Sequence, residues 1–387
     1  DRPRAIIART LKGKGLSLLE DKDGWHGKPV PKVELDAALK ELSIPFHSES
    51  YTPSPRLSIP VEAAIVEHRV DVTHKLGDQV ATREAYGDAL AKLADKDPRI
   101  VALDGDTKNS TFSQKLLIDH ADQFFEMFIA EQNMVGVAAG MSACGKIPFV
   151  STFAAFLTRG FDQIRMARIS RANICFVGSH CGISIGQDGP SQMGLEDIAM
   201  FRTIPDSVIL YPSDAVSTER LIARLANQEG ISYLRTTRPK VAVIYDSNEE
   251  FEIGGAKTLR QSDDDRITVV GAGITLHEAL KAYEILKKQS CAVRVVDSYS
   301  VKPIDAAHLL RAAEETGGQL VVVEDHYWDG GLGDAVLNAV GNRAEVHKMA
   351  VQGVPRSGAP DKLMDAFGIS AANIVTLVQK LISDRTR

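Results

Sequence analysis

Short apolar runs alternate along the chain with longer stretches in which apolar residues recur every three or four positions. The runs at 99–103, 174–177, 208–210 and 232–234 each predict a buried strand, and polar or glycine-containing residues follow each of them. Stretches between the runs, such as the small-residue segment 135–143, have the spacing of helices. Because parallel neighbours need a long crossover, this alternation predicts an α/β domain with a mostly parallel sheet.

A second α/β unit follows the polar stretch 250–265. The run 267–273 predicts a strand and a tight turn, and further strands are predicted at 292–296 and 320–323. Its Gly271-Ala272-Gly273 turn is a weak sign of a dinucleotide site, since no third glycine and no suitably spaced acidic residue follow. The predicted fold class is α/β, with two consecutive doubly wound, mostly parallel sheet domains. One face of the helix expected after the turn carries Leu276, Ala279, Leu280, Tyr283 and Leu286.

The first 45 residues show less regular patterning. Residues 4–10 predict a buried strand with no strand before it to pair with, so we expect the chain to be part of something larger. A polar, glycine-rich loop at 12–29 precedes a predicted helix. Its spacing predicts an apolar face formed by Val33, Ala37, Leu39 and Leu42.

A proline-containing segment separates this part from the first sheet domain. Pro53, Pro55 and Pro60 interrupt any regular pattern and indicate a linker over 46–79. Thr82 is then predicted to cap a helix. The apolar face of that helix is formed by Tyr86, Leu90 and Leu93.

Charge and composition exclude several classes of partner. The net charge is −6 and no run of basic residues occurs, so neither nucleic acid nor an anionic membrane surface is an expected partner. We find no apolar stretch as long as a membrane span. The four cysteines have no metal-ligand or redox spacing, which predicts buried reduced thiols and a cytoplasmic protein. They are Cys144, Cys175, Cys181 and Cys291.

The segment 129–134 is the most informative for chemistry. Glu131 lies where an apolar strand is expected to give way to a helix, and strand ends of open α/β sheets open into the functional crevice. Phe153 and Phe156 follow soon after, spaced by three. A carboxylate and an aromatic wall suit a flat heteroaromatic cofactor. The alternative is a helix-start glutamate with two ordinary core phenylalanines.

Four predicted strand-end loops carry further polar residues, and loops of this kind converge in an active site on this architecture. Arginine forks, a hydroxyl and an imidazole would suit a phosphate or sugar phosphate, and Arg83 adds to that set. Ordinary surface charge is the alternative for each arginine. No cluster has the spacing of a metal site, the Gly186–Gly189 run included. The loop residues are Asp106, Ser110, Glu131, His180, Asp188, Gln192 and Arg238.

Ordered motifs along nearly the whole chain resemble transketolase, especially its animal-like branch. The segments 103–110, 129–134, 151–156, 178–182 and 187–192 resemble its pyrimidine-binding domain. Those at 12–15, 20–21 and 25–28 resemble the end of its pyrophosphate-binding domain, and those at 323–326 and 354–358 resemble its C-terminal domain. The resemblance implies a thiamine diphosphate-binding fold plus a transketolase C-terminal domain. The expected divisions are a pyrophosphate-domain tail at 1–45, a linker at 46–79, a pyrimidine-binding domain at 80–248 and a C-terminal domain at 249–387.

The resemblance also implies roles for single residues. Glu131 matches the residue that hydrogen-bonds the aminopyrimidine ring, and Glu131, His26 and His180 are the expected catalytic groups. The expected cofactor contacts are Lys12, His26, Asp106, Glu131, Phe153, Phe156 and Gln192. The expected substrate contacts, on phosphate or hydroxyl groups, are His26, Arg83, Ser110, His180, Asp188 and Arg238.

One part of the family pattern is not found in the sequence. The Gly-Asp-Gly…Asn magnesium motif is missing, so the resemblance implies Mg²⁺ ligands on a missing domain or a partner chain and none here. A pyrophosphate-domain subunit or a missing N-terminal part is therefore an expected partner, within a homodimer or heterotetramer. Whether the chain is a split subunit or an excerpt stays open.

The predicted function is thiamine diphosphate-dependent transfer of a two-carbon ketol unit from a ketose phosphate to an aldose phosphate, as in the pentose phosphate pathway and the Calvin cycle. One alternative is a related enzyme, similar to deoxyxylulose phosphate synthase or a ketoacid dehydrogenase β subunit. Another is a non-catalytic fragment that only dimerises.

Overall fold

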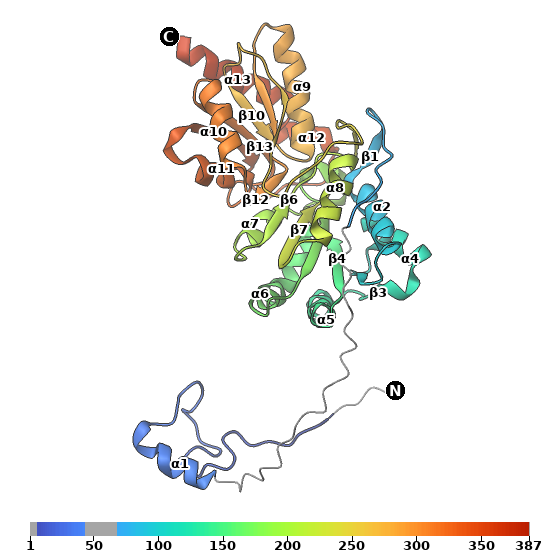
Figure 1. Cartoon of the computed structure of the whole chain (residues 1–387). Coiled ribbons are helices and arrows are strands. Elements are labelled where there is room, and N and C mark those ends of the chain that lie inside the picture. The colour runs from blue at the N-terminus through green and yellow to red at the C-terminus, as the bar shows by residue number, and fades with distance from the viewer. Residues whose placement is uncertain (1–5, 43–67, 387) are drawn as a thin grey trace. The chain divides into compact units, whose positions relative to one another are not determined.

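The computed structural model describes residues 6–42 and 68–386 of the chain. The chain divides into two compact units, residues 1–65 and 66–387 (Figure 1). In the first unit, a 3₁₀ turn η1 (Lys32–Glu34) leads into helix α1 (Leu35–Glu41). The helix predicted in this region is confirmed, but its apolar side is not buried. Of the residues of α1 only Ala38 is buried, while Val33, Leu39 and Leu42 are exposed.

The strand predicted at 4–10 is wrong over the part that the structure describes. Residues 6–10 form no strand, and Ile6 and Ile7 are 94% and 93% exposed. A β-strand satisfies its backbone groups by pairing with a neighbour, and the described residues of this unit include no strand that could serve as one. The remaining residues of the prediction, Arg4 and Ala5, lie outside the described residues.

The second unit contains a seven-stranded sheet with the strand order β12-β6-β7-β5-β4-β2-β3. All neighbours in it are parallel except β12 and β6. The strands predicted from the apolar runs are therefore confirmed, although β12 comes from beyond the predicted domain boundary at 249. The bounds are β2 (Ile100–Asp104), β3 (Phe124–Glu126), β4 (Ile147–Phe153), β5 (Ile174–Ser179), β6 (Val208–Leu210), β7 (Ile231–Arg235) and β12 (Ser300–Lys302).

Helices cover both faces of this sheet, because its strands alternate buried apolar side chains between two cores. On β2, Val101 and Leu103 pack in the core beneath α5 (Glu131–Ala143), α6 (Phe161–Ile169) and α7 (Asp197–Arg202). Ile100 and Ala102 pack in the opposite core beneath α2 (Thr82–Ala94), α4 (Gln114–Asp119) and α8 (Ala215–Ala226). This two-sided burial confirms the doubly wound prediction.

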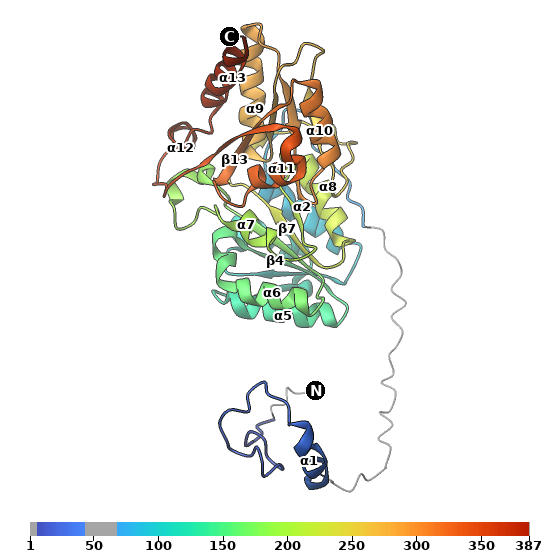
Figure 2. The same cartoon turned by 90° about the vertical axis from the view of Figure 1, so that its left-hand side faces the viewer.

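A five-stranded sheet follows, with the order β14-β13-β10-β11-β9 and one antiparallel pair, β11 with β9. Its strands are β9 (Lys257–Arg260), β10 (Thr268–Gly271), β11 (Arg294–Asp297), β13 (Gln319–Tyr327) and β14 (Glu345–Val351). Helices α10 (Ala306–Glu315) and α11 (Leu332–Val340) pack on one face. Helices α9 (Ile274–Lys288), α12 (Pro360–Ala366) and α13 (Ala371–Thr386) pack on the other, with α13 along α9 (Figure 2).

The last two helices are apolar enough, by length and composition, for Pro360–Asp384 to cross a membrane. The stretch is nevertheless broken between α12 and α13, where Gly368 has a φ of 76°. Leu363, Ile374 and Val378 are buried in the core beside α9. Packing in this core buries 33% of the most apolar 18-residue window of the stretch.

Residues 68–78 have no helix or strand, yet they pack on the first sheet domain. His68 and Val70 are 5% and 1% exposed, and the His68 imidazole lies 2.8 Å from Asn227 Oδ1 and 2.9 Å from Asp97 Oδ2. The linker predicted at 46–79 thus includes a packed end, while residues 43–67 lie outside the described residues. A short antiparallel pair, β1 (Gln79–Ala81) with β8 (Lys240–Ala242), follows.

Two local predictions need correction. Thr82 is the first residue of α2 rather than its cap, and its hydroxyl accepts a hydrogen bond from the Thr237 backbone N–H at 2.9 Å. Cys144 is exposed, because α5 ends at Ala143 and the following turn lies at the surface, whereas Cys175 and Cys181 are buried as predicted. Tyr86, Leu90 and Leu93 are fully buried, as the helical spacing predicted.

Candidate active site

The polar residues after β2, β4, β5 and β7 lie at one edge of the seven-stranded sheet, because these strands are parallel and end in register. The loop after β2 is organised by Asp104, which is fully buried. Its carboxylate accepts hydrogen bonds from the Thr107 backbone N–H and from the hydroxyls of Thr111 and Ser113 at 2.6–2.8 Å. Burial raises the pKa of Asp104, and these donors oppose the rise.

His180, Asp188 and Arg238 come together from the loops after β5 and β7. His180 Nε2 lies 3.8 Å from Asp188 Oδ2, and Arg238 Nε lies 3.4 Å from the same oxygen. Arg238 also donates to the Ile185 carbonyl at 3.0 Å. An acid, an imidazole and a guanidinium therefore lie close together and offer both hydrogen-bond donors and acceptors.

Arg83, on the first turn of α2, extends this group. Its pKa is lowered, mainly by burial and next by the charge of Arg238, so the two guanidinium groups lie close enough to repel each other. Arg83 donates to the Ser110 carbonyl at 2.7 Å, which places Ser110 beside this group, and the predicted role of its hydroxyl stays a prediction. Arg83 Nε is buried without a hydrogen-bond partner among the described residues. An oxyanion would relieve the repulsion and satisfy that donor.

Phe153 and Phe156, predicted to form an aromatic wall for a cofactor, lie side by side. The two rings stack with centroids 5.1 Å apart. Phe153 also stacks on the His180 imidazole at 3.8 Å. Sequence spacing did not indicate this second contact, because His180 follows a different strand.

His180 is held in a conformation that differs from ordinary loop geometry. Its φ is 58°, in a region that residues other than glycine rarely adopt and that often accompanies functional sites. Burial, and next the charges of Arg83 and Arg238, lower the pKa of His180 to about 3. At neutral pH the imidazole is therefore uncharged, with one nitrogen to donate and one to accept.

Glu131 is the first residue of α5 and is 3% exposed. Arg159 Nη1 lies 3.4 Å from its carboxylate, which is the nearest ion pair. A cavity of about 480 Å³ lies beside this pair and is lined by Ile129, Ala130, Glu131, Gln132, Asn133 and Arg159. Arg159 belongs to η3 (Ala154–Gly160), the turn that also carries Phe156, so one segment touches both the Glu131 carboxylate and the aromatic wall.

The remaining predicted residues lie outside these contacts. Asp106 is exposed, with a φ of 62°, and its backbone N–H donates to Glu126 at 3.0 Å. Gln192 is half-buried on the loop that carries Asp188. Lys12 Nζ and His26 Nδ1 lie 3.4 Å apart within the N-terminal unit. The predicted site residues thus lie in several separate local groups.

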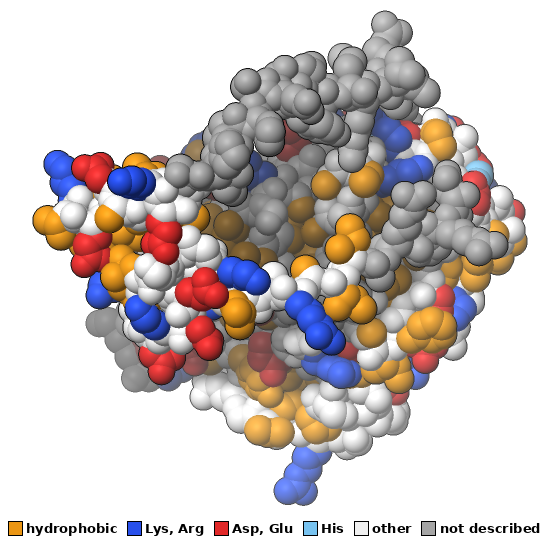
Figure 3. Space-filling view, turned by 90° about the horizontal axis from the view of Figure 1, so that it is seen from below, with side chains coloured by type: hydrophobic (Ala, Val, Ile, Leu, Met, Phe, Trp, Pro, Cys, Tyr) orange, Lys and Arg blue, Asp and Glu red, His pale blue; other side chains and the backbone are white. Residues whose placement is uncertain are grey.

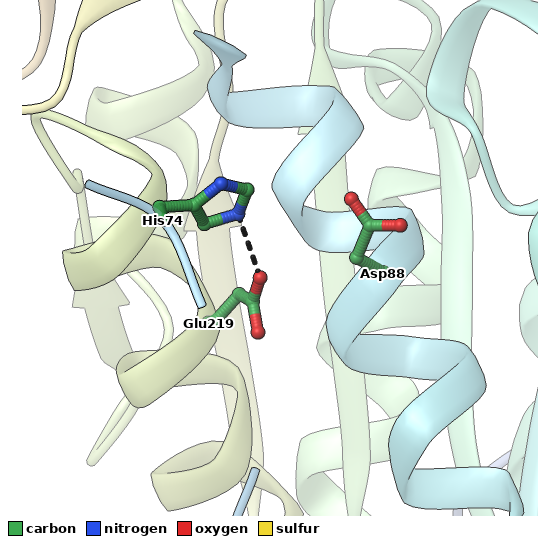
Figure 4. A group of neighbouring side chains, drawn as sticks. All are labelled: His74, Asp88 and Glu219. Atoms are coloured by element: carbon green, nitrogen blue, oxygen red, sulfur yellow. Dashed lines mark hydrogen bonds and ion pairs between the residues drawn. The ribbon is translucent and has the colours of Figure 1, made fainter. Parts of the chain in front are cut away.

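A separate group of metal-binding residue types lies between α2 and α8. The nearest donor atoms of His74, Asp88 and Glu219 lie within 4.8 Å of one another (Figure 4). Spacing could not reveal this group, because its members come from three distant segments. Lys92 and Lys115 already pair with Glu219 and Asp88 at 2.6 Å. These cations balance the carboxylates, and the group is explained as a structural ion-pair cluster.

Comparisons with known proteins match the same regions. Residues 78–243 match the family described as "Transketolase, pyrimidine binding domain", and residues 254–374 match "Transketolase, C-terminal domain". A solved structure titled "Split gene transketolase, inactive beta4 tetramer" is 37% identical, with a TM-score of 0.70 over 78% of this chain and 98% of that one. The chain belongs to the transketolase family.

Curated relatives within the transketolase family are longer than this chain. It is 51% identical to mouse transketolase-like protein 2 over 388 residues, 99% of this chain and 62% of that protein. It is 50% identical to human transketolase over 387 residues, 98% of this chain and 62% of that protein. The domain boundaries predicted from the sequence stay predictions.

Transketolase-family enzymes depend on thiamine diphosphate, and the residues present fit the pyrimidine part of that cofactor. The buried Glu131 carboxylate lines a cavity. Phe153 and Phe156, which stack on each other, lie on or next to the segment that carries Arg159. Arg159 and Asp104 are the residues near the site that the sequence prediction missed. Arg159 lies three residues after Phe156, one helical turn on, and this spacing was the available signal.

Proposed function

We propose that this chain contributes the pyrimidine-binding and C-terminal domains to a transketolase that moves a two-carbon ketol unit from a ketose phosphate to an aldose phosphate. The pyrophosphate-binding part and its Mg²⁺ ligands would come from a further segment or a second chain. The assembly would be a homodimer, or a heterotetramer if two chains are used. A cytoplasmic location stays a prediction.

The observation that carries the proposal is the group of Arg83, Arg238, His180 and Asp188 at the sheet edge. Two guanidinium groups, one with a buried donor lacking a partner among the described residues, suit a phosphate. An uncharged imidazole and a carboxylate beside them suit sugar hydroxyls, since they offer both donor and acceptor capacity. A keto acid without phosphate or extra hydroxyls would leave these groups unsatisfied.

Glu131 would act on the cofactor side of the same site. When bound, thiamine diphosphate supplies the carbon nucleophile and electron sink that ketol transfer requires. The Glu131 carboxylate would hold a hydrogen bond at the pyrimidine ring nitrogen, and Phe153 and Phe156 would orient the ring. Lys12 and His26 match cofactor-contacting positions of the family, and their roles stay predictions. These assignments follow the family pattern at matching positions.

Mixing tests the proposal directly. The chain would be combined with a separately produced chain that carries the Gly-Asp-Gly…Asn motif, then assayed with thiamine diphosphate and Mg²⁺. We expect transfer from xylulose 5-phosphate to ribose 5-phosphate only in the mixture. The split-gene structure named above is titled inactive as a β4 tetramer, and this supports expecting no turnover from the chain alone.

The same assay separates the alternatives. Pyruvate used in place of the ketose phosphate would indicate a related enzyme of the deoxyxylulose phosphate synthase or ketoacid dehydrogenase kind. A stable complex with no turnover on either donor would indicate a non-catalytic dimerising fragment. Both results would contradict the proposed transketolase activity.

A further inference from the structure

The loop that carries His180 and Asp188 rests against the C-terminal domain. Within it, the 3₁₀ segment η4 (Ile183–Asp188) begins three residues after His180 and ends at Asp188. Helix α12 of the C-terminal domain packs against η4. Substrate-facing groups on the first sheet are therefore positioned partly by residues of the second.

Asp325, at the carboxyl end of β13, makes the closest polar contacts to this loop. Its two carboxylate oxygens accept hydrogen bonds from the backbone N–H groups of Ile183 at 2.7 Å and Ser184 at 3.2 Å. Asp325 is fully buried. The carboxylate thus satisfies the free N–H groups at the start of η4, which a buried segment must pair.

The backbone of the loop approaches Asp325 so closely that a side chain would not fit. A Cβ on Gly182 would lie 2.0 Å from Asp325 Oδ2, and Gly182 has a φ of 77°. Two residues of the C-terminal domain approach the loop in the same way. A Cβ on Gly189 would lie 2.6 Å from Ser357 Oγ, and a Cβ on Gly186 would lie 2.9 Å from Pro360 Cγ. Close contacts with the C-terminal domain therefore occur along the loop from Gly182 to Gly189.

A buried ion pair fixes the other side of Asp325. The Arg235 guanidinium donates to the Asp325 carbonyl at 2.9 Å, to the Gly194 carbonyl at 2.8 Å and to Asp197 Oδ2 at 2.7 Å. Arg235 and Asp197 are both fully buried at 0–1% exposure. Since Arg235 ends β7 and Asp325 lies two residues before the end of β13, this network joins the two sheets behind the loop.

We propose that Asp325 is a positioning residue for the substrate site, through which the C-terminal domain sets the geometry of His180 and Asp188. The inference deepens the proposed function and rests on it. It predicts that loosening Asp325 affects recognition of sugar hydroxyls before it affects cofactor chemistry. Glu131 and the aromatic wall make no contact with Asp325 among the described hydrogen bonds.

Steady-state kinetics of the reconstituted enzyme test this with Asp325→Asn. The amide would turn an N–H toward one of the two donors, so the loop should shift. We expect KM for xylulose 5-phosphate to rise about ten- to hundredfold, because small misplacements of binding groups are costly, while kcat changes much less. Hydroxypyruvate, a donor without the extra hydroxyls, should be affected far less.

Glu324→Gln is the matched control. Glu324 precedes Asp325 on β13, is buried, and accepts two backbone hydrogen bonds from Leu332 and Gly333 at 2.5 and 3.0 Å. Those donors begin α11 and not η4. A general loss of stability should appear in both variants, whereas the change in donor preference should appear only in Asp325→Asn. Equal donor preference in the two variants would overturn the inference.

Two further measurements test the inference when a variant fails to fold or when the reconstituted mixture is inactive. Gly182→Ala perturbs the same contact from the loop side and should reproduce the donor preference of Asp325→Asn. NMR of the His180 imidazole needs no activity, with its signal assigned by loss in His180→Gln. In the chain alone, Asp325→Asn should raise the pKa of His180 from about 3, and Glu324→Gln should not. An unchanged His180 signal in Asp325→Asn would overturn the inference, while an inactive mixture with wild-type chain would overturn only the proposed function.

Discussion

At the scale of single residues, Glu131 was predicted from its place between a strand and a helix, and the structure puts it there. Its burial and its contact with Arg159 were not predictable, because the spacing of Arg159 from Phe156 does not show that the arginine reaches Glu131. Distances between loops depend on how strands order themselves in the sheet, and sequence spacing does not contain that order. The same reason explains the unpredicted stacking of Phe153 on His180.

Replacing Glu131 should abolish turnover while leaving the fold intact. Glu131→Ala removes a group proposed to hold a proton at the cofactor rather than one that fills the core, so we expect a loss of about 100- to 10,000-fold in kcat. Glu131→Gln keeps the shape and should lose nearly as much. Stopped assays on the mixture, with circular dichroism to verify folding, measure this. Activity within a few-fold of wild type would refute the assignment.

Arg238 gives a selective prediction at the same scale. Arg238→Ala removes a charge-assisted contact worth roughly 1.5–3 kcal/mol, so kcat/KM for xylulose 5-phosphate should fall by the corresponding factor of about ten to a hundred. Hydroxypyruvate has no phosphate and should be nearly unaffected. Arg238→Lys, which keeps the charge but not the fork, should fall between. Equal losses on both donors would exclude a phosphate role.

At the scale of elements, buried strands were predicted well because each is a short apolar run between polar ends. The strand at 4–10 failed for a physical reason: its apolar residues satisfy the pattern, but no neighbour pairs with residues 6–10 in the described part of the chain. The exposed side of α1 has the same origin. Apolar patterning identifies the apolar face of a helix or strand, but it does not show whether another part of the protein covers that face.

Exposed apolar side chains also occur on the second unit, around the helices near Glu131. Phe128, Ile129 and Ile169 are 69%, 66% and 61% exposed. Figure 3 shows hydrophobic side chains among charged ones at the surface in one view of the chain. We expect further chains of the proposed assembly to cover exposed apolar side chains such as these.

The packed segment 68–78 yields a prediction on pH. The hydrogen bond to Glu219 is the main cause of the raised pKa of His74, and burial opposes it. A raised folded-state pKa gives stability that is complete below about pH 6.5 and is lost as pH rises through the folded value. His74→Gln should therefore lower the free energy of unfolding more at pH 6 than at pH 8.5, by less than about 1 kcal/mol.

Urea denaturation at the two pH values measures this. Glu219→Gln supplies the control, since it removes the partner that raises the pKa of His74. In that background the added His74→Gln change should no longer be more destabilising at pH 6 than at pH 8.5, because burial and the charge of Lys92 lower the pKa of His74. A pH-independent effect of His74→Gln in the wild-type background would show that the pair does not contribute as described.

At the scale of the whole molecule, the two α/β domains and their order were predictable, since each repeats the strand and helix pattern. Their mutual contacts were not. The strand β12 joins the first sheet from the second domain, and Asp325 reaches across to the substrate loop. These contacts arise from tertiary packing between segments more than 80 residues apart, and local patterns do not record them.

The central claim is that this chain holds the pyrimidine side of a shared cofactor site and needs a pyrophosphate-domain partner to complete it. Isothermal titration calorimetry with thiamine diphosphate, with and without Mg²⁺, tests it most directly. The chain alone should show weak binding that does not depend on Mg²⁺, and the mixture should show tight, Mg²⁺-dependent binding that weakens with Glu131→Ala. Tight, Mg²⁺-dependent binding by the chain alone would contradict the account.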